Sequence, residues 1–252
     1  VDELRRPDQP AEPAMVSPSQ GVHLVLDRSF LPGQSAMLVP RTTDGRVLFM
    51  VPWLGHALIG TTDTPRPDVE LSVEASESRM AAPAPLPLAQ EVSFVLETAG
   101  RYLARAPALS DVRSAWAGLR PLVRPQGAAG HTAQVSREHT VLVAPSRLVS
   151  VTGGKWTTYR HMAQQVLDTA IAHGLLPARQ CVTRILPLAC ADDVPSVREK
   201  PADLDEAAVR TAILRDGALT VEDVLARRRR QLFLHVEGAR SNATWVAQLA
   251  GG

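Results

Sequence analysis

The residues with the clearest chemical potential are two glycines and a lysine between a short apolar run and a helical pattern. The run from Leu148 to Val151 is predicted to form a buried strand, and Gly153, Gly154 and Lys155 follow it. Apolar residues then recur at helical spacing over residues 159–171. A helix N-terminus presents unpaired N–H groups and a positive partial charge, so it can hold an anion or an electron-rich ring edge. A plain turn with a solvated lysine would give the same pattern, and the residues alone leave both interpretations open.

This turn does not match the loop that binds nucleoside triphosphates. Such a loop needs a glycine five residues before its last glycine, and a serine or threonine after its lysine. Val149 and Trp156 occupy those two positions here.

A histidine stands on the first strand that the sequence predicts. Val22, Leu24 and Leu26 alternate with His23 and other residues, so His23 faces away from the apolar side. Further strands are expected over residues 36–40, 46–52 and 57–62, joined by tight turns as an antiparallel meander. His23 then lies either on a ligand-facing sheet or at an ordinary edge or core position.

The rest of the chain supplies the elements that position these residues. We expect a proline-rich connection over 63–90, then a helix, a strand over 114–122, and a hairpin that pairs roughly 132–143 with 147–151. One face of that helix carries Val92, Val95, Leu96, Ala99 and Leu103. Gly174 fits the C-cap of the helix after the glycine turn.

The last part of the chain is predicted to be a small helical region. Residues 177–204 resemble a loop, 205–215 form a helix, and Thr220 to Asp223 resemble a capping box that opens a second helix. That helix is expected to contain Arg227 to Arg230, which could bind nucleic acid or acidic lipid, or could form a solvated helix face. The predicted domains are an irregular lead-in over 1–20, a main domain over 21–176 and a helical domain over 177–252.

Composition narrows the functional class. The 252 residues are 45% hydrophobic with a net charge of +1, which supports a sizeable core and favours neither nucleic acid nor membrane as a partner. No segment is long and apolar enough to span a membrane, and the N-terminus has no apolar signal region. Cys181 and Cys190 lack a metal-ligand pattern, so we expect free thiols and no metal site.

Four segments of the chain carry a family resemblance when they are taken together. They are Gly21 to Leu26, Val39 to Asp63, Trp116 to Leu122, and Ser136 to His139 leading to Gly153 to Arg160. In this order and at these spacings they resemble the FAD-dependent glycerol-3-phosphate dehydrogenases. The resemblance covers about residues 20–176 and resumes over 220–228.

The resemblance implies a fold of the α+β class. The implied architecture is the antiparallel or mixed-sheet substrate domain of a FAD-dependent (DAO-like) oxidoreductase with a small C-terminal helical domain. The family's Gly-x-Gly-x-x-Gly fingerprint does not occur in this sequence. The chain is therefore expected to correspond to the substrate-binding and C-terminal portion, without the N-terminal FAD-binding half.

The resemblance also implies an activity. Hydride from C2 of sn-glycerol 3-phosphate would pass to FAD, giving dihydroxyacetone phosphate, and a quinone would accept the electrons. The expected location is the cytoplasm or the inner face of the cell membrane, with peripheral association. Two alternatives remain: an inactive truncated module that binds a phosphorylated polyol without flavin, and another flavin amine or hydroxy-acid oxidase of the same architecture.

Residues in the matching motifs receive roles on this basis. Arg120, Arg137 and Lys155 would clamp the substrate phosphate, because arginine grips two phosphate oxygens at once. His23 is the candidate proton acceptor, and Arg120 is assigned with it to the catalytic group although its high pKa suits a clamp better than a base.

Six residue assignments concern the pocket wall and the flavin. Thr61 and Thr62 would line the substrate pocket, with ordinary strand-end hydrogen bonding as the alternative. Gly153, Gly154, Lys155 and Thr157 would contact the flavin edge.

Overall fold

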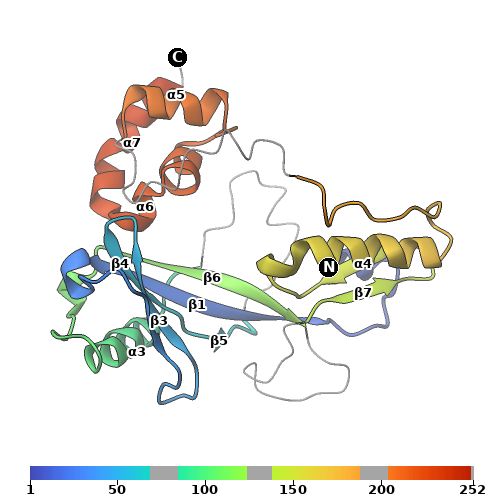
Figure 1. Ribbon diagram of the computed structural model, residues 1–252, viewed down its shortest axis with the longest axis horizontal. Coiled ribbons are helices and arrows are strands. Elements are labelled where there is room, and N and C mark those ends of the chain that lie inside the picture. The colour runs from blue at the N-terminus through green and yellow to red at the C-terminus, as the bar shows by residue number, and fades with distance from the viewer. Residues whose placement is uncertain (69–84, 124–137, 188–203, 251–252) are drawn as a thin grey trace. The chain divides into compact units, whose positions relative to one another are not determined.

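The computed structural model describes residues 1–68, 85–123, 138–187 and 204–250 (Figure 1). The chain divides into two compact units, each assembled from three segments of chain. Unit 1 comprises Val1–Gln20, Asp63–Ala84 and Leu119–Val194, and unit 2 comprises Gly21–Thr62, Pro85–Gly118 and Pro195–Gly252. The domains predicted from the sequence are contiguous, with boundaries at residues 20 and 176, whereas each compact unit combines separate segments. Those boundaries stay a prediction.

Strand β1 (Val16–Asp27) begins earlier than expected and is the longest strand of the fold. The lead-in was predicted to be irregular, but it contains the short helix α1 (Asp2–Arg5) as well as the first residues of β1. The Asp2 carboxylate accepts hydrogen bonds from the backbone N–H groups of Met15 and Val16, each at 2.9 Å. These hydrogen bonds anchor the start of β1. They could not be predicted from hydrophobic periodicity, because they involve a polar side chain.

The sheet of unit 2 is antiparallel, as predicted, but its strand order differs from a meander. Strands β2 (Met37–Val39), β3 (Leu48–Trp53) and β4 (His56–Gly60) are joined in sequence order, and β1 pairs with β4 rather than with β2. The pairing sets His23 opposite Gly60. Because β4 pairs with β1, the backbone of Gly60 lies next to His23.

The core of unit 2 lies between this sheet and helix α3 (Ala89–Gly100), which Figure 1 shows beside β3. The period-two pattern is confirmed on β1, where Val22, Leu24 and Leu26 are fully buried. Val25, on the opposite face, is fully buried as well, so this part of β1 is covered on both sides. The helix contributes Val95 and Ala99 to the same core.

The C-terminal helices pack around a second core within unit 2. They are α5 (Glu206–Leu214), the π-helix η5 (Asp223–Arg228), α6 (Gln231–Leu234) and α7 (Val236–Ala250), the orange-to-red group of Figure 1. The capping box is confirmed: Thr220 Oγ1 accepts from Asp223 N at 3.0 Å, and the Asp223 carboxylate accepts from Thr220 N at 2.9 Å.

The four arginines do not share one helix, contrary to expectation. Helix η5 ends at Arg228, and Arg230 adopts the left-handed conformation (φ 58°) before α6 begins. Arg227 forms ion pairs with Glu222 and Asp223, and Arg228 donates to the Asp216 carbonyl. These intramolecular contacts agree with the solvated-face interpretation.

In unit 1, helix α4 (Tyr159–Ala172) lies along the hairpin of β7 (Thr140–Val143) and β8 (Val149–Thr152), as Figure 1 shows. Gly174 ends the helix with φ 65° in a Schellman motif: Leu175 N donates to Ala170 O, and Gly174 N donates to Ile171 O. The predicted helix and C-cap are confirmed. The hairpin is confirmed as the pairing of residues 140–143 with 149–152, but its second strand is not buried as predicted, since Leu148 and Val151 are each 38% exposed. The short strand β5 (Thr64–Pro65) and strand β6 (Ser114–Val123) both pair with β1.

Three 3₁₀ turns complete the described elements: η1 (Arg28–Phe30), η2 (Leu109–Asp111) and η4 (Trp156–Thr158). Of the helices in the described ranges, none has both the length and the apolar character that a bilayer crossing requires.

Candidate functional site

The glycine turn of unit 1 requires glycine at both positions. Gly153 and Gly154 have φ values of +78° and +82°, a region that disfavours residues with a Cβ. A Cβ on Gly153 would lie 2.7 Å from the Glu138 carbonyl oxygen, and one on Gly154 would lie 2.4 Å from Met162 Sδ. Backbone conformation and packing therefore both fix the path of the chain between β8 and α4.

The turn leads into a polar helix start. Turn η4 precedes α4, and Thr158 Oγ1 both donates to the Lys155 carbonyl at 2.9 Å and accepts from Lys155 N at 3.3 Å. The first-turn N–H groups of Trp156 and Thr157 find no backbone acceptor within the described part of the chain. Lys155 and Thr157 are exposed, and the Trp156 ring, stacked on Tyr159 at 5.6 Å, is 86% exposed. This region offers N–H donors and one cation to an anionic or electron-rich group.

Arg120 of β6 lies beside a buried carboxylate in the same unit. Its Nη1 is 3.8 Å from Asp63 Oδ1, and the Asp63 side chain is only 9% exposed. Ser19 Oγ donates a hydrogen bond to Asp63. The Asp63 carboxylate lies within ion-pair distance of the Arg120 guanidinium, so it offsets part of the positive charge of Arg120.

His23 of unit 2 packs between a backbone and an indole ring. A Cβ on Gly60 would lie 2.5 Å from His23 Cδ2, so the imidazole lies directly against β4. The ring stacks on Trp116 of β6, with centroids 5.7 Å apart and planes inclined by 16°. This packing restricts the orientations that the imidazole can adopt.

The two threonines of unit 2 differ. Thr62 is buried, and its hydroxyl donates to Glu91 Oε1 at 2.9 Å and accepts from Val22 N at 3.0 Å. Glu91 Oε2 accepts in turn from Leu88 N at 3.0 Å, at the start of α3. This network matches the strand-end alternative for Thr62. Thr61 is partly exposed, and its hydroxyl donates to the Thr62 carbonyl at 3.2 Å.

The predicted site residues thus fall into two groups. Unit 1 holds the cations and the glycine turn, and unit 2 holds the histidine and the threonines; Arg137 lies outside the described residues. The members of the first group are Arg120, Gly153, Gly154, Lys155 and Thr157, and those of the second are His23, Thr61 and Thr62.

Sequence reasoning missed three residues that shape these groups. Asp63 and Trp116 lie within the motifs that carry the family resemblance, so their positions were visible but not their contacts. Phe233, 4.9 Å from Trp116 between ring centroids, follows the arginine run without any motif to mark it.

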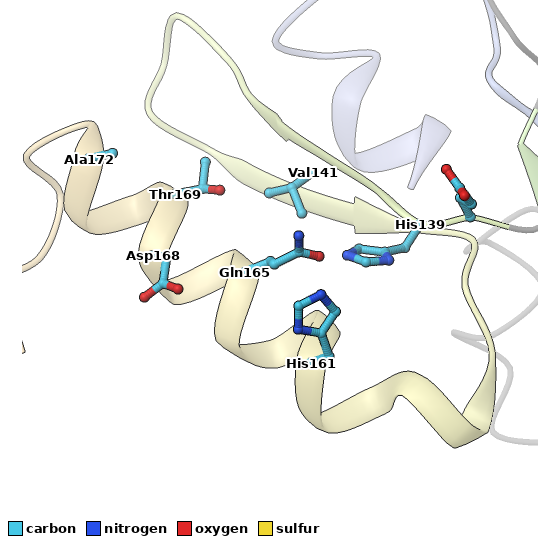
Figure 2. A pocket seen from close by; sticks show the side chains of 8 residues that line it. His139, Val141, His161, Gln165, Asp168, Thr169 and Ala172 are labelled. Carbon is cyan, nitrogen blue, oxygen red and sulfur yellow. The ribbon is translucent and has the colours of Figure 1, made fainter. Parts of the chain in front are cut away.

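Unit 1 also contains a hollow that the sequence did not predict. It has a volume of about 840 Å³ and lies between β7 and α4. In Figure 2 the side chains of His139, His161 and Gln165 point toward one another at its centre, and the two imidazole centroids are 6.2 Å apart. Among the described residues no group of three or more His, Cys, Asp and Glu side chains is placed to hold a metal ion.

Local hydrogen bonds lower the pKa of several side chains, among them Cys181 and Asp223. The hydrogen bond with the Thr183 hydroxyl lowers the pKa of the Cys181 thiol. The hydrogen bond from Leu219 N, followed by that from the Thr220 hydroxyl, lowers the pKa of the Asp223 carboxyl.

Comparison of the chain with known proteins shows which family it belongs to. The model of the family described as FAD dependent oxidoreductase (DAO) matches residues 1–174. A mitochondrial glycerol-3-phosphate dehydrogenase of Arabidopsis thaliana is 41% identical over 182 residues, which are 72% of this chain and 27% of that protein. A probable mitochondrial glycerol-3-phosphate dehydrogenase of Caenorhabditis elegans is 40% identical over 185 residues, 72% of this chain and 24% of that protein. The chain thus spans about a quarter of the length of these curated relatives.

A solved structure shows the same fold. The glycerol-3-phosphate dehydrogenase from Bacillus halodurans, complexed with FAD, superposes with a TM-score of 0.71 at 24% identity, covering 99% of this chain and 56% of that chain. The expected α+β fold of the DAO type is confirmed. With a family model matched over residues 1–174, the chain belongs to the FAD dependent oxidoreductase family.

Proposed function

We propose that this chain is part of an FAD-dependent glycerol-3-phosphate dehydrogenase and contributes its substrate-binding residues. The observation that carries the proposal is the glycine turn with Lys155 at a helix start, inside a region 41% identical to a glycerol-3-phosphate dehydrogenase. The reaction is oxidation of the C2 hydroxyl of sn-glycerol 3-phosphate to the ketone of dihydroxyacetone phosphate.

Arg120 and Lys155, with Arg137, bind the substrate phosphate. The planar guanidinium of Arg120, which lies 3.8 Å from the Asp63 carboxylate, can grip two phosphate oxygens at once. Each charge-assisted hydrogen bond contributes about 1.5–3 kcal/mol net. Because the phosphate is remote from C2, this grip chiefly fixes the position of the reacting carbon.

His23 takes the proton that leaves the C2 hydroxyl. Oxidation of a secondary alcohol removes a hydride from carbon and a proton from oxygen, and an imidazole ring nitrogen can accept that proton near neutral pH. Stacking on Trp116 restricts the plane of the imidazole, so the ring nitrogens lie in a defined plane. Arg120 and Lys155 serve as charged donors in this scheme.

The glycine turn fits the edge of a flavin ring. Gly153 and Gly154 present backbone without side chains, and the helix start adds the N–H groups of Trp156 and Thr157 and the Lys155 ammonium. These groups suit an electron-rich ring edge, because they supply donors and positive charge together. When bound, FAD supplies the two-electron acceptor for the hydride. Lys155 and the N–H groups would hold the flavin edge and would favour negative charge there.

The proposal extends to the electron acceptor and the location. A quinone is the proposed final acceptor, which would place the enzyme peripherally on the inner face of a membrane. A phosphate-binding module without flavin is the competing proposal, and flavin content distinguishes the two.

Turnover of an artificial acceptor by the flavin-loaded holoenzyme tests the function. We expect reduction that depends on glycerol 3-phosphate and that glycerol does not support. Arg120→Gln should raise KM for glycerol 3-phosphate about tenfold to a hundredfold, because one charge-assisted contact is lost. The matched control is Arg240→Gln, on an exposed position of α7. Equal KM values for the two variants would contradict the role of Arg120, and purified protein without flavin would favour the competing proposal.

A further inference from the structure

Four rings form a connected cluster in unit 2, which we name the Trp116 cluster. Trp116 of β6 is its centre. The imidazole of His23 stacks on it at 5.7 Å, Phe233 of α6 meets it at 4.9 Å with planes inclined by 58°, and Trp53 of β3 lies at 6.0 Å and 49°. The cluster therefore joins the strand that carries His23 to the C-terminal helices.

His23 has little freedom within this cluster. The backbone of Gly60 contacts the imidazole so closely that even a methyl group there would clash, at 2.5 Å from Cδ2. Trp116 stacks on the same imidazole nearly in parallel. Aromatic rings in such offset contact have preferred geometries, so removing the indole would release the imidazole from a defined orientation.

The C-terminal helices are attached next to Trp116. Ser114 Oγ, two residues before Trp116 on β6, donates to the Leu232 carbonyl at 3.0 Å. Val236 N donates to the Arg113 carbonyl at 3.4 Å. These two hydrogen bonds flank Phe233 in sequence, so they hold its ring against the indole.

We propose that Trp116 is a positioning residue for His23, and that Phe233 makes the C-terminal helices part of this positioning. The inference rests on the proposed function, since it concerns the residue proposed to take the substrate proton. Phe233 supports the indole, and the indole orients the imidazole. The C-terminal helices then act on the chemical step through the contact of Phe233 with Trp116.

NMR of the histidine ring protons tests the geometry on the chain as it stands, without flavin or substrate. In the unsubstituted chain the His23 signals should lie upfield of free histidine, because the indole face shields them; His23→Gln identifies the signals. Trp116→Leu should move them downfield toward the free value, and Trp116→Phe should restore part of the shift because it keeps a ring. Phe233→Leu should move them in the same direction by less.

Leu219→Ala is the matched control, because Leu219 is 90% exposed in the same C-terminal region. It should leave the His23 signals in place. Unchanged His23 signals in Trp116→Leu would overturn the proposal. A response to Trp116→Leu without any response to Phe233→Leu would overturn the part assigned to the C-terminal helices.

Kinetics of the holoenzyme test the consequence. Trp116→Leu should lower kcat about tenfold to a hundredfold, because misplacing a reacting group by about 1 Å has effects of this size. KM for glycerol 3-phosphate should change much less, because phosphate binding depends on the cations of unit 1. Trp116→Phe should recover part of kcat, whereas a rise in KM with unchanged kcat would overturn positioning. Absence of any glycerol 3-phosphate oxidation in the unsubstituted holoenzyme would instead refute the proposed function, while the NMR result would still report on the stack.

Discussion

The two regions proposed to form the functional site, the His23 region and the glycine turn, lie in opposite surroundings. His23 lies on β1, whose neighbouring Val22 and Leu24 are fully buried, and its ring contacts Trp116 and the backbone of Gly60. At the glycine turn, Lys155, Trp156 and Thr157 are exposed, and α4 behind them buries only Ala170. The His23 side chain is therefore oriented by contacts within its own unit, whereas the side chains of the glycine turn are exposed to solvent.

The difference indicates how each region would work. The imidazole is held by the fold before any ligand arrives, which suits a group that must take a proton in one direction. The glycine turn has a fixed backbone but exposed side chains, which suits contact with a flat ring through N–H groups. Substitutions should therefore affect the folding of the His23 region strongly, and those at the glycine turn should chiefly affect binding.

The largest expected difference between the two regions is in the free energy of unfolding, and it comes from the core next to His23. Leu24→Ala should destabilise unit 2 by about 2–5 kcal/mol, because it removes a fully buried side chain. Leu167→Ala on α4 is the counterpart, since Leu167 is 54% exposed, and it should change the free energy of unfolding by less than about 0.5 kcal/mol. Urea denaturation of the two variants measures both values, and similar losses would contradict the comparison.

The Thr62 hydroxyl should come next. Thr62→Val removes a donor to Glu91 and an acceptor for Val22 N, leaving buried polar groups unsatisfied at a cost of about 1–3 kcal/mol. Thr61→Val, at a partly exposed position, should cost less in the same assay. A larger loss of stability in Thr61→Val than in Thr62→Val would show that the hydrogen bonds of Thr62 with Glu91 and Val22 do not stabilise this part of unit 2.

A backbone substitution tests the glycine turn. Gly154→Ala forces a Cβ into the left-handed region, at a cost of about 1–2 kcal/mol, and brings it against Met162. Flavin retention by the purified holoenzyme should fall. Gly33→Ala, where the φ is ordinary and no atom lies within 4 Å of the new Cβ, is the control and should leave flavin content unchanged. Equal flavin content in both variants would contradict the proposal that the glycine turn contacts the flavin.

The smallest effect concerns acid stability of the C-terminal helices. The pKa of Asp223 is lowered from 3.8 by its hydrogen bonds with Leu219 N and Thr220. A lowered carboxyl pKa gives stability that is present above pH 3.8 and lost as pH falls through the folded-state value. Asp223→Asn should therefore reduce the loss of helix measured by circular dichroism below that pH. An unchanged acid transition would show that the Asp223 cap does not contribute to it.

Local patterns predicted much of this fold, and long-range contacts account for the rest. The alternation on β1, the Schellman glycine at position 174 and the capping box at Thr220 follow from neighbouring residues, and all are confirmed. The pairing of β1 with β4 and the contact of Trp116 with Phe233 join residues far apart in sequence, and no periodicity encodes them. The residue types of the candidate site were visible from the family motifs, but the ion pair between Asp63 and Arg120 was not.

Anaerobic mixing of the flavin-loaded holoenzyme with glycerol 3-phosphate tests the central claim most directly. The proposal predicts loss of the visible absorbance of oxidised flavin, no loss with glycerol, and a slower loss in His23→Gln at saturating substrate. Oxidised flavin that persists after saturating glycerol 3-phosphate would contradict it.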